Sequence, residues 1–395
     1  MPKDPSDQKA DSRPSPEQMT MARQKAGVGK GLKNDGKYKE ARAELEGALE
    51  MMEQAGASPE ERVPVLLDLS HANLRLGNID RCMALAEEAM RSIALPGLPI
   101  GLKGEMTMQY GIALTSKGDL VEGLKNLERA LALFETAGDK VGVAKACRNI
   151  GNVYAGRSVF GKALAYYSRA LKLHDELGMM RDRWYTLYNV ALVKRDQALY
   201  SDSFSDFEEM LRYFKGTDDL FMMSRSLANM GVLRLAMGKY DEALRYIDDS
   251  SRINKELGEQ WVEAMNIVNK AEVLLAMGDV KGARTVISDS TEAIMGTGSE
   301  EAKGLALRVR GMVLREEGQF DKAEEDFALG ELVFEGRGFG VDLARLYIEW
   351  ALTALAAKKR GKAVALFGKA RAIYRRLSLP IKERELDTII HAHGL

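Results

Sequence analysis

The sequence has few of the residues that mark a metal-binding, disulfide-bonded or secreted protein. Among 395 residues there are 2 cysteines and 4 histidines. Cys82 and Cys147 cannot form a disulfide framework, so we expect two buried thiols in a reducing compartment. His391 and His393 stand at i and i+2, which places them on different faces of a helix and argues against a shared metal. We expect no metal and no cofactor.

The sequence also lacks an excess of either charge and any long apolar run. It has 57 Lys and Arg against 58 Asp and Glu, which argues against a general nucleic-acid binder. No window approaches the roughly 18 apolar residues of a membrane span. Residues 1–18 are polar and match neither a signal peptide nor a transit sequence. We therefore expect a cytoplasmic protein that binds neither nucleic acid nor membrane, and its oligomeric state stays open.

What the sequence does contain is a repeated pair of amphipathic helices, seen most clearly in residues 144–170. Gly151 and Tyr154 lie one turn apart on a first helix, and Phe160, Ala163 and Tyr167 mark the buried stripe of a second. Neither short helix can bury its apolar face alone. The unit is therefore expected to stack on copies of itself.

The copies recur in four aligned columns at a period of 40 or 41 residues. A small residue recurs where the helices of a pair cross, and an apolar residue follows four positions later. The small column is Ala41, Cys82, Gly123, Ala163, Ser203, Ala243, Ala283, Ala323 and Ala363. The apolar column is Leu45, Ala86, Leu127, Tyr167, Phe207, Ile247, Ile287, Phe327 and Phe367.

These columns resemble the tetratricopeptide repeat, whose second helix opens with Gly-x-aromatic-x-x-Ala. Gly36-Lys37-Tyr38 with Ala41 and Gly238-Lys239-Tyr240 with Ala243 are good matches. The period is longer than the common 34 residues, and the closing Pro is missing. The long form is similar to the repeats of kinesin light chain, spindle-orientation scaffolds and bacterial peptide-pheromone receptors. The resemblance implies an all-α, right-handed superhelical solenoid of about nine helix-turn-helix repeats with a C-terminal capping helix.

The expected organisation is one elongated domain with short flanking segments. Residues 1–18 should form a disordered polar tail, residues 19–378 the repeat solenoid, and residues 379–395 a capping helix that begins after Pro380. Glycines such as Gly138 and Gly178 should end the second helices in the left-handed conformation. Asp218 replaces this glycine in the fifth repeat, and we expect a less regular turn there.

No pattern in the sequence supports catalysis. The stretch Gly27-Val28-Gly29-Lys30-Gly31 resembles part of a phosphate-binding loop, but it lacks the following Ser or Thr and the preceding strand. No nucleophile, histidine and acid fall together in the repeat frame. We therefore predict no catalytic residues, and no helix-turn-helix or catalytic domain beside the repeats.

Amide side chains occupy one first-helix position in five consecutive repeats, and packing does not explain them. This amide ladder is Gln109, Asn149, Asn189, Asn229 and Asn269. In tetratricopeptide repeats this position faces the concave groove, so the amides are candidates to donate to and accept from an extended peptide backbone. The alternative is that they bond to neighbouring helices and only orient the repeats.

Neighbouring groove positions in the same frame are basic or aromatic. They are Lys145, Arg148, Asn152, Tyr185, Tyr188, Arg195 and Arg225, with Arg308 two repeats later. This local excess suggests an acidic partner segment or a terminal carboxylate. The alternative is that the tyrosines are packing residues and the cations pair with acids such as Asp196 and Glu272.

The sequence thus predicts a non-enzymatic scaffold that binds a protein or peptide partner, possibly acidic, in its concave groove. The second hypothesis is a regulatory sensor whose solenoid changes shape when it binds a small peptide or effector, as the resemblance to pheromone receptors implies.

Overall fold

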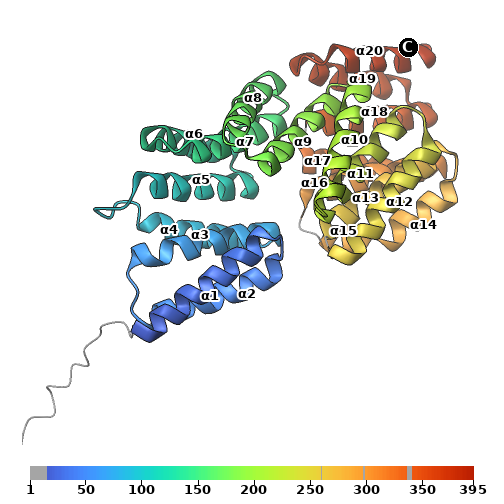
Figure 1. The fold of residues 1–395 in the computed structure, drawn as a ribbon. Coiled ribbons are helices and arrows are strands. Elements are labelled where there is room, and N and C mark those ends of the chain that lie inside the picture. Colours follow the sequence, from blue (N-terminus) through green and yellow to red (C-terminus); the bar gives the residue numbers. More distant parts are fainter. Residues whose placement is uncertain (1–15, 259, 297–298, 336–339) are drawn as a thin grey trace, which may run out of the picture. The chain divides into compact units, whose positions relative to one another are not determined.

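The computed structural model describes residues 16–258, 260–296, 299–335 and 340–395. All regular structure in these ranges is helical, so the predicted all-α class is confirmed (Figure 1). By their mutual contacts the residues divide into two compact units, Met1–Val153 (unit 1) and Tyr154–Leu395 (unit 2). The boundary falls inside one helix, α7 (Lys140–Gly156). The single elongated domain expected from the repeat pattern is thus described as two units.

Helices of 13 to 19 residues fill unit 1. They are α1 (Pro16–Asn34), α2 (Tyr38–Gln54), α3 (Pro59–Arg75), α4 (Ile79–Arg91), α5 (Ile100–Lys117) and α6 (Leu120–Ala137). The glycine-rich stretch that resembles a phosphate-binding loop lies inside α1, where helical backbone leaves no loop to hold a phosphate. Helix α1 begins three residues before the predicted start of the solenoid, and residues 1–15 of the predicted tail lie outside the described part.

Unit 2 continues the alternation of first and second helices. They are α8 (Phe160–Glu176), α9 (Met180–Asp196), α10 (Tyr200–Gly216), α11 (Leu220–Ala236), α12 (Tyr240–Leu257), α13 (Gln260–Ala276), α14 (Val280–Asp289), α15 (Thr291–Gly296), α16 (Glu300–Glu316), α17 (Phe320–Phe334), α18 (Gly340–Ala356), α19 (Arg360–Arg376) and α20 (Pro380–Ala392). Each second helix starts at the aromatic or aliphatic position that the repeat frame predicts, except α19, which starts at Arg360.

The two sequence columns form the helix crossings. Ala163, Ser203 and Ala243 are fully buried, and so are the larger residues Phe207 and Ile247 that follow in the apolar column. The serine is accommodated because its hydroxyl donates to the Ala191 carbonyl at 2.8 Å, leaving no buried donor unsatisfied. The small residues therefore let helices approach closely while the next column fills the space between them.

The turns between helices use the left-handed conformation even where glycine is missing. Asp218 has φ +53°, close to the +68° of Gly138 and the +66° of Gly178. The hydrogen bonds of this turn are nevertheless less regular, as expected: the Gly138 amide donates to the Glu135 carbonyl at 3.1 Å, whereas at Asp218 both the Thr217 and the Asp219 amides donate to the Phe214 carbonyl. The bond from the Asp219 amide, at 3.1 Å, is the one that the glycine turns also have, and it offsets the modest cost of a non-glycine residue in this region.

Helix α20 begins at Pro380 in its first turn, as the sequence predicts, because proline lacks the amide that a first-turn residue leaves unpaired. Its buried face is Lys382, Leu386 and Ile390. The sequence predicts only a solvated cap. The structure adds a contact with Tyr200 at the start of α10.

A charged chamber in unit 2

The inner faces of the first helices of unit 2 surround a cavity of about 480 Å³, which we call the chamber. Helices α9, α11, α13, α16 and α18 supply most of its wall, and α20 lines it with Lys382, Glu385, Leu386 and Ile389. Polar wall residues from the first helices are Tyr188, Arg195, Arg225, Asn229, Asn269, Glu272, Glu301, Arg308, Asp342, Arg345 and Glu349. The volume lies in the range of small-ligand sites, about 300–1,000 Å³.

The structure brings together only part of the predicted site. Tyr188, Arg195, Arg225, Asn229 and Asn269 line the chamber. Asn189 and Tyr185 also belong to unit 2 but do not line it. The remaining predicted residues belong to unit 1 and are described separately: Gln109, Lys145, Arg148, Asn149 and Asn152.

In unit 1 two amides of the ladder bond within the chain, Gln109 to the preceding repeat and Asn149 to its own helix and, at 3.7 Å, to the Met108 sulfur. Gln109 is 6% exposed, and its Nε2 donates to Ser70 Oγ at 3.0 Å. Asn149 Nδ2 donates to the Lys145 carbonyl at 3.0 Å, within its own helix. These bonds match the alternative in which the amides orient helices.

Asn229 is also engaged by its own chain. Its Nδ2 donates to Tyr188 Oη at 2.8 Å and to the Arg225 carbonyl at 2.9 Å, while its Oδ1 accepts from Arg195 Nη1 at 2.7 Å. Asn269 lines the same chamber one repeat later, and its amide has no hydrogen bond to the residues that the structure describes. The two neighbouring amides of the ladder therefore differ: one is structural, and the other faces open space.

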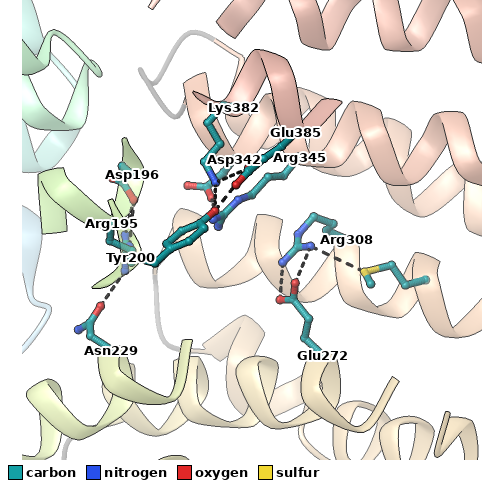
Figure 2. A network of polar contacts seen from close by, with 11 residues as sticks. Arg195, Asp196, Tyr200, Asn229, Glu272, Arg308, Asp342, Arg345, Lys382 and Glu385 are labelled. Carbon is teal, nitrogen blue, oxygen red and sulfur yellow. Dashed lines mark hydrogen bonds and ion pairs between the residues drawn. The ribbon is translucent and has the colours of Figure 1, made fainter. Parts of the chain in front are cut away.

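The arginines that suggest an acidic partner are largely compensated within the chain. Arg308 is 4% exposed and makes two hydrogen bonds with the Glu272 carboxylate, at 2.6 and 3.2 Å (Figure 2). Arg195 pairs with Asp196 at 2.9 Å. The Arg225 guanidinium lies 5.1 Å from the ring centroids of both Tyr188 and Trp261. The cations of the chamber are thus held by acids and aromatic rings, as the alternative interpretation anticipated.

A pair of carboxyl groups on α16 and α18 is less well compensated. Burial and the nearby charge of Asp342 raise the pKa of Glu301 to about 7. Burial also raises the pKa of Asp342, whose ion pair with Arg345 is long, at 3.8 Å. Within the described ranges Glu301 has no hydrogen bond or ion pair. A positive group of a ligand could therefore form charge-assisted hydrogen bonds with these carboxyls.

Sequence reasoning missed several chamber residues that its own frame contains. Arg345 stands three repeats of 40 after Arg225, and Glu349 stands three repeats after Asn229, in the amide column. Extending the columns of Arg225 and Asn229 by three repeats would have found both residues. Lys382 and Tyr200 belong to a capping helix and a second helix, so a frame built on first helices has no place for them.

Comparison with known proteins gives the class. Models described as "Tetratricopeptide repeat" match residues 104–176 and 226–260. These two stretches are therefore tetratricopeptide repeats, as the columns predict.

Similar sequences and solved structures were compared over the length of the chain. The chain is 23% identical over 177 residues to the photosystem I assembly protein Ycf3 of Acaryochloris marina, covering 44% of this chain and 96% of that protein. A solved Rap protein complexed with competence and sporulation factor has a TM-score of 0.72 at 15% identity, covering 91% of this chain and 99% of that one.

Two further solved structures share the fold. The Rap conjugation gene regulator of plasmid pLS20, in complex with the Phr* peptide, has a TM-score of 0.62 at 13% identity, covering 93% and 97%. Aspartyl phosphate phosphatase F of Bacillus subtilis has a TM-score of 0.57 at 14% identity, covering 89% and 93%. The predicted resemblance to peptide-pheromone receptors is thus confirmed at the level of the fold.

Proposed function

We propose that this chain is a non-enzymatic, cytoplasmic peptide-binding protein whose ligand occupies the chamber of unit 2. The observation that carries the proposal is a cavity whose wall combines an unengaged amide, Asn269, with the carboxyls of Glu301 and Asp342. A carboxamide can pair with both polar groups of a peptide backbone. The chamber volume suits a segment of a few residues.

The charges of the chamber favour a ligand with a positive group. Burial, and then repulsion from Asp342, keep the pKa of Glu301 at about 7, and an ammonium or guanidinium beside Glu301 and Asp342 would offset both. Binding should then release a proton from Glu301 near neutral pH, because the cation stabilises the ionised carboxylate.

The predicted preference for an acidic partner finds its support in unit 1 instead. There burial, together with the nearby charges of Lys33, Arg75, Arg148 and Lys145, lowers the pKa of His71 to about 3. We therefore propose that an acidic segment contacts Lys145, Arg148 and Asn152, while the chamber takes a segment that carries a positive group. Unit 1 is thus proposed to bind an acidic segment, and unit 2 a segment with a positive group.

A regulatory sensor is the second candidate function, and a site lined by several repeats favours it over a passive scaffold. A ligand that fills the chamber contacts several repeats at once, so it can shift their relative orientation. Two of the structural neighbours are complexes, one with a factor and one with a peptide. A measurable change in unit 2 on binding would favour the sensor.

The test is selection of short peptides from a displayed random library, followed by calorimetric titration of the enriched sequences. We expect them to carry Lys, Arg or a free amino terminus, and Asn269→Ala and Glu301→Gln should each weaken binding at least five-fold. Lys125→Ala, on the exposed face of α6, is the control and should leave affinity unchanged. Small-angle scattering with and without peptide then separates sensor from scaffold. Peptides that bind both chamber variants as well as the native protein would overturn the proposed site.

A further inference from the structure

Helix α20 has contacts that a capping helix does not require. A terminal helix in a repeat protein covers the apolar face of the last repeat, and Leu386 and Ile390 do this. The same helix also reaches the first residue of α10, which lies 182 residues earlier in the chain. There the Lys382 ammonium donates to Tyr200 Oη, and Tyr200 Oη donates to Glu385 Oε2 at 3.5 Å (Figure 2).

The contact is built around a buried charge. Lys382 is 4% exposed, its ammonium lies 4.9 Å from the centroid of the Tyr200 ring, and Glu385 pairs with it at 3.4 Å. Removing an ammonium from water is costly unless it is paired. Glu385 lies on α20 with Lys382, whereas Tyr200 pairs with both of them only while α20 lies against α10. The position of the helix and the satisfaction of this charge are therefore coupled.

The residues that make this contact also form part of the chamber wall. Tyr200, Lys382 and Glu385 all line the chamber, with Leu386 and Ile389 of the same helix beside them. Displacing α20 from α10 would remove that side of the wall. Apart from Tyr374 of α19, the rest of the wall comes from first helices, each packed between neighbouring helices of the array.

We propose that α20 is a lid on the chamber, held closed by a latch made of Lys382, Tyr200 and Glu385. With the latch closed, the chamber admits a short peptide or a free chain end. With the latch open, an internal segment of a longer chain can pass. The inference rests on the proposed function in that it takes the chamber as the binding site, but the latch itself is tested without any ligand.

The first test is hydrogen exchange of α20 measured by mass spectrometry. Tyr200→Phe removes the hydroxyl and keeps the ring, and Lys382→Met removes the charge and keeps an unbranched stem. We expect either change to speed amide exchange in α20 about ten-fold or more, with exchange in α13 and α16 unchanged. Tyr240→Phe is the matched control, because Tyr240 holds the same position at the start of α12. Unaltered exchange of α20 in both variants would overturn the latch.

The second test measures access to the chamber. Met265 lines it, and a thiol placed there by Met265→Cys reports on entry because both native cysteines are buried. We expect a bulky polymer-linked maleimide to label this thiol at least five-fold faster when Tyr200→Phe or Lys382→Met is added. Faster exchange of α20 without faster labelling would refute its role as a lid. Neither test uses a peptide, so failure of the lid is distinguishable from failure of the proposed binding site.

Discussion

Replacing the two neighbouring asparagines of the chamber, one at a time, should have opposite consequences. Asn229→Ala removes two bonds donated by Nδ2 and one accepted by Oδ1 from the charged Arg195. Neutral bonds contribute about 0.5–1.5 kcal/mol each and a bond to a charged group about 1.5–3. Because water in the chamber can replace part of this pairing, we expect a loss of about 1–3 kcal/mol. Asn269→Ala removes no bond found among the described residues and should change stability by less than about 0.5 kcal/mol.

Urea unfolding of both variants, followed by titration with a selected peptide, provides the measurement. Asn269→Ala should keep its unfolding midpoint and weaken peptide binding. Asn229→Ala should lower the midpoint first, and Asn229→Asp gives a further check, since it keeps the acceptor for Arg195 and loses the amide donor. Equal midpoints for Asn229→Ala and Asn269→Ala would show that the hydrogen bonds of Asn229 do not stabilise the fold, and the distinction between the two amides would fail.

Three further outcomes follow from the structure. Arg308→Met should cost about 3 kcal/mol because it leaves the Glu272 carboxylate without its buried partner, and adding Glu272→Gln should recover most of the loss in urea unfolding. The pKa of Glu301 is raised to about 7 from its ordinary value of 4.5, so its contribution to stability is present below pH 4.5 and lost as pH rises through 7. Glu301→Gln should therefore stabilise the fold by about 1–3 kcal/mol at pH 8 and by almost nothing near pH 4.5; a gain independent of pH would contradict this. Ala163→Trp and Ala243→Trp should each cost at least about 1–3 kcal/mol by overpacking fully buried crossings, and unchanged thermal melts would show that the packing face is misassigned.

The fold was predictable because it repeats a local rule. Each repeat places a small residue at a crossing and an apolar residue one turn later, and fully buried Ala163, Ala243, Phe207 and Ile247 show that both columns were assigned to the correct face. The class of each element followed from the same period. What the pattern overstated was the need for glycine in the turns, since Asp218 adopts the same conformation.

The site was predictable only in part, because the frame gives the direction of a side chain and not its partner. Asn229 and Asn269 have the same residue type at the same position, yet only Asn229 has a tyrosine hydroxyl within reach. That tyrosine, Tyr188, belongs to the preceding repeat, and the equivalent residue for Asn269 is Ala228, which has no hydroxyl. The difference is visible in the sequence once the partner column is known, but the column itself is read from the structure.

The contact between α20 and α10 could not be predicted from the repeat pattern. Each repeat adds a small rotation to its predecessor, and the position of the last helix depends on the sum of these rotations. Small errors in each step accumulate. The polar character of Lys382 in an otherwise apolar stripe was the one sequence signal of this contact, and a solvated lysine explains it equally well.

The contact between Lys382 and Tyr200 also limits how this half of the chain can evolve. Arrays of repeats commonly lengthen and shorten by duplication and deletion, because each repeat interacts only with its neighbours and a stack of any length is satisfied. Between Tyr200 and Lys382 the number of repeats is constrained. Inserting or removing one 40-residue copy would carry α20 away from α10, and the Lys382 ammonium, which is buried in this contact, would lose its bond to Tyr200. Changes in repeat number should therefore be tolerated outside this interval and selected against within it.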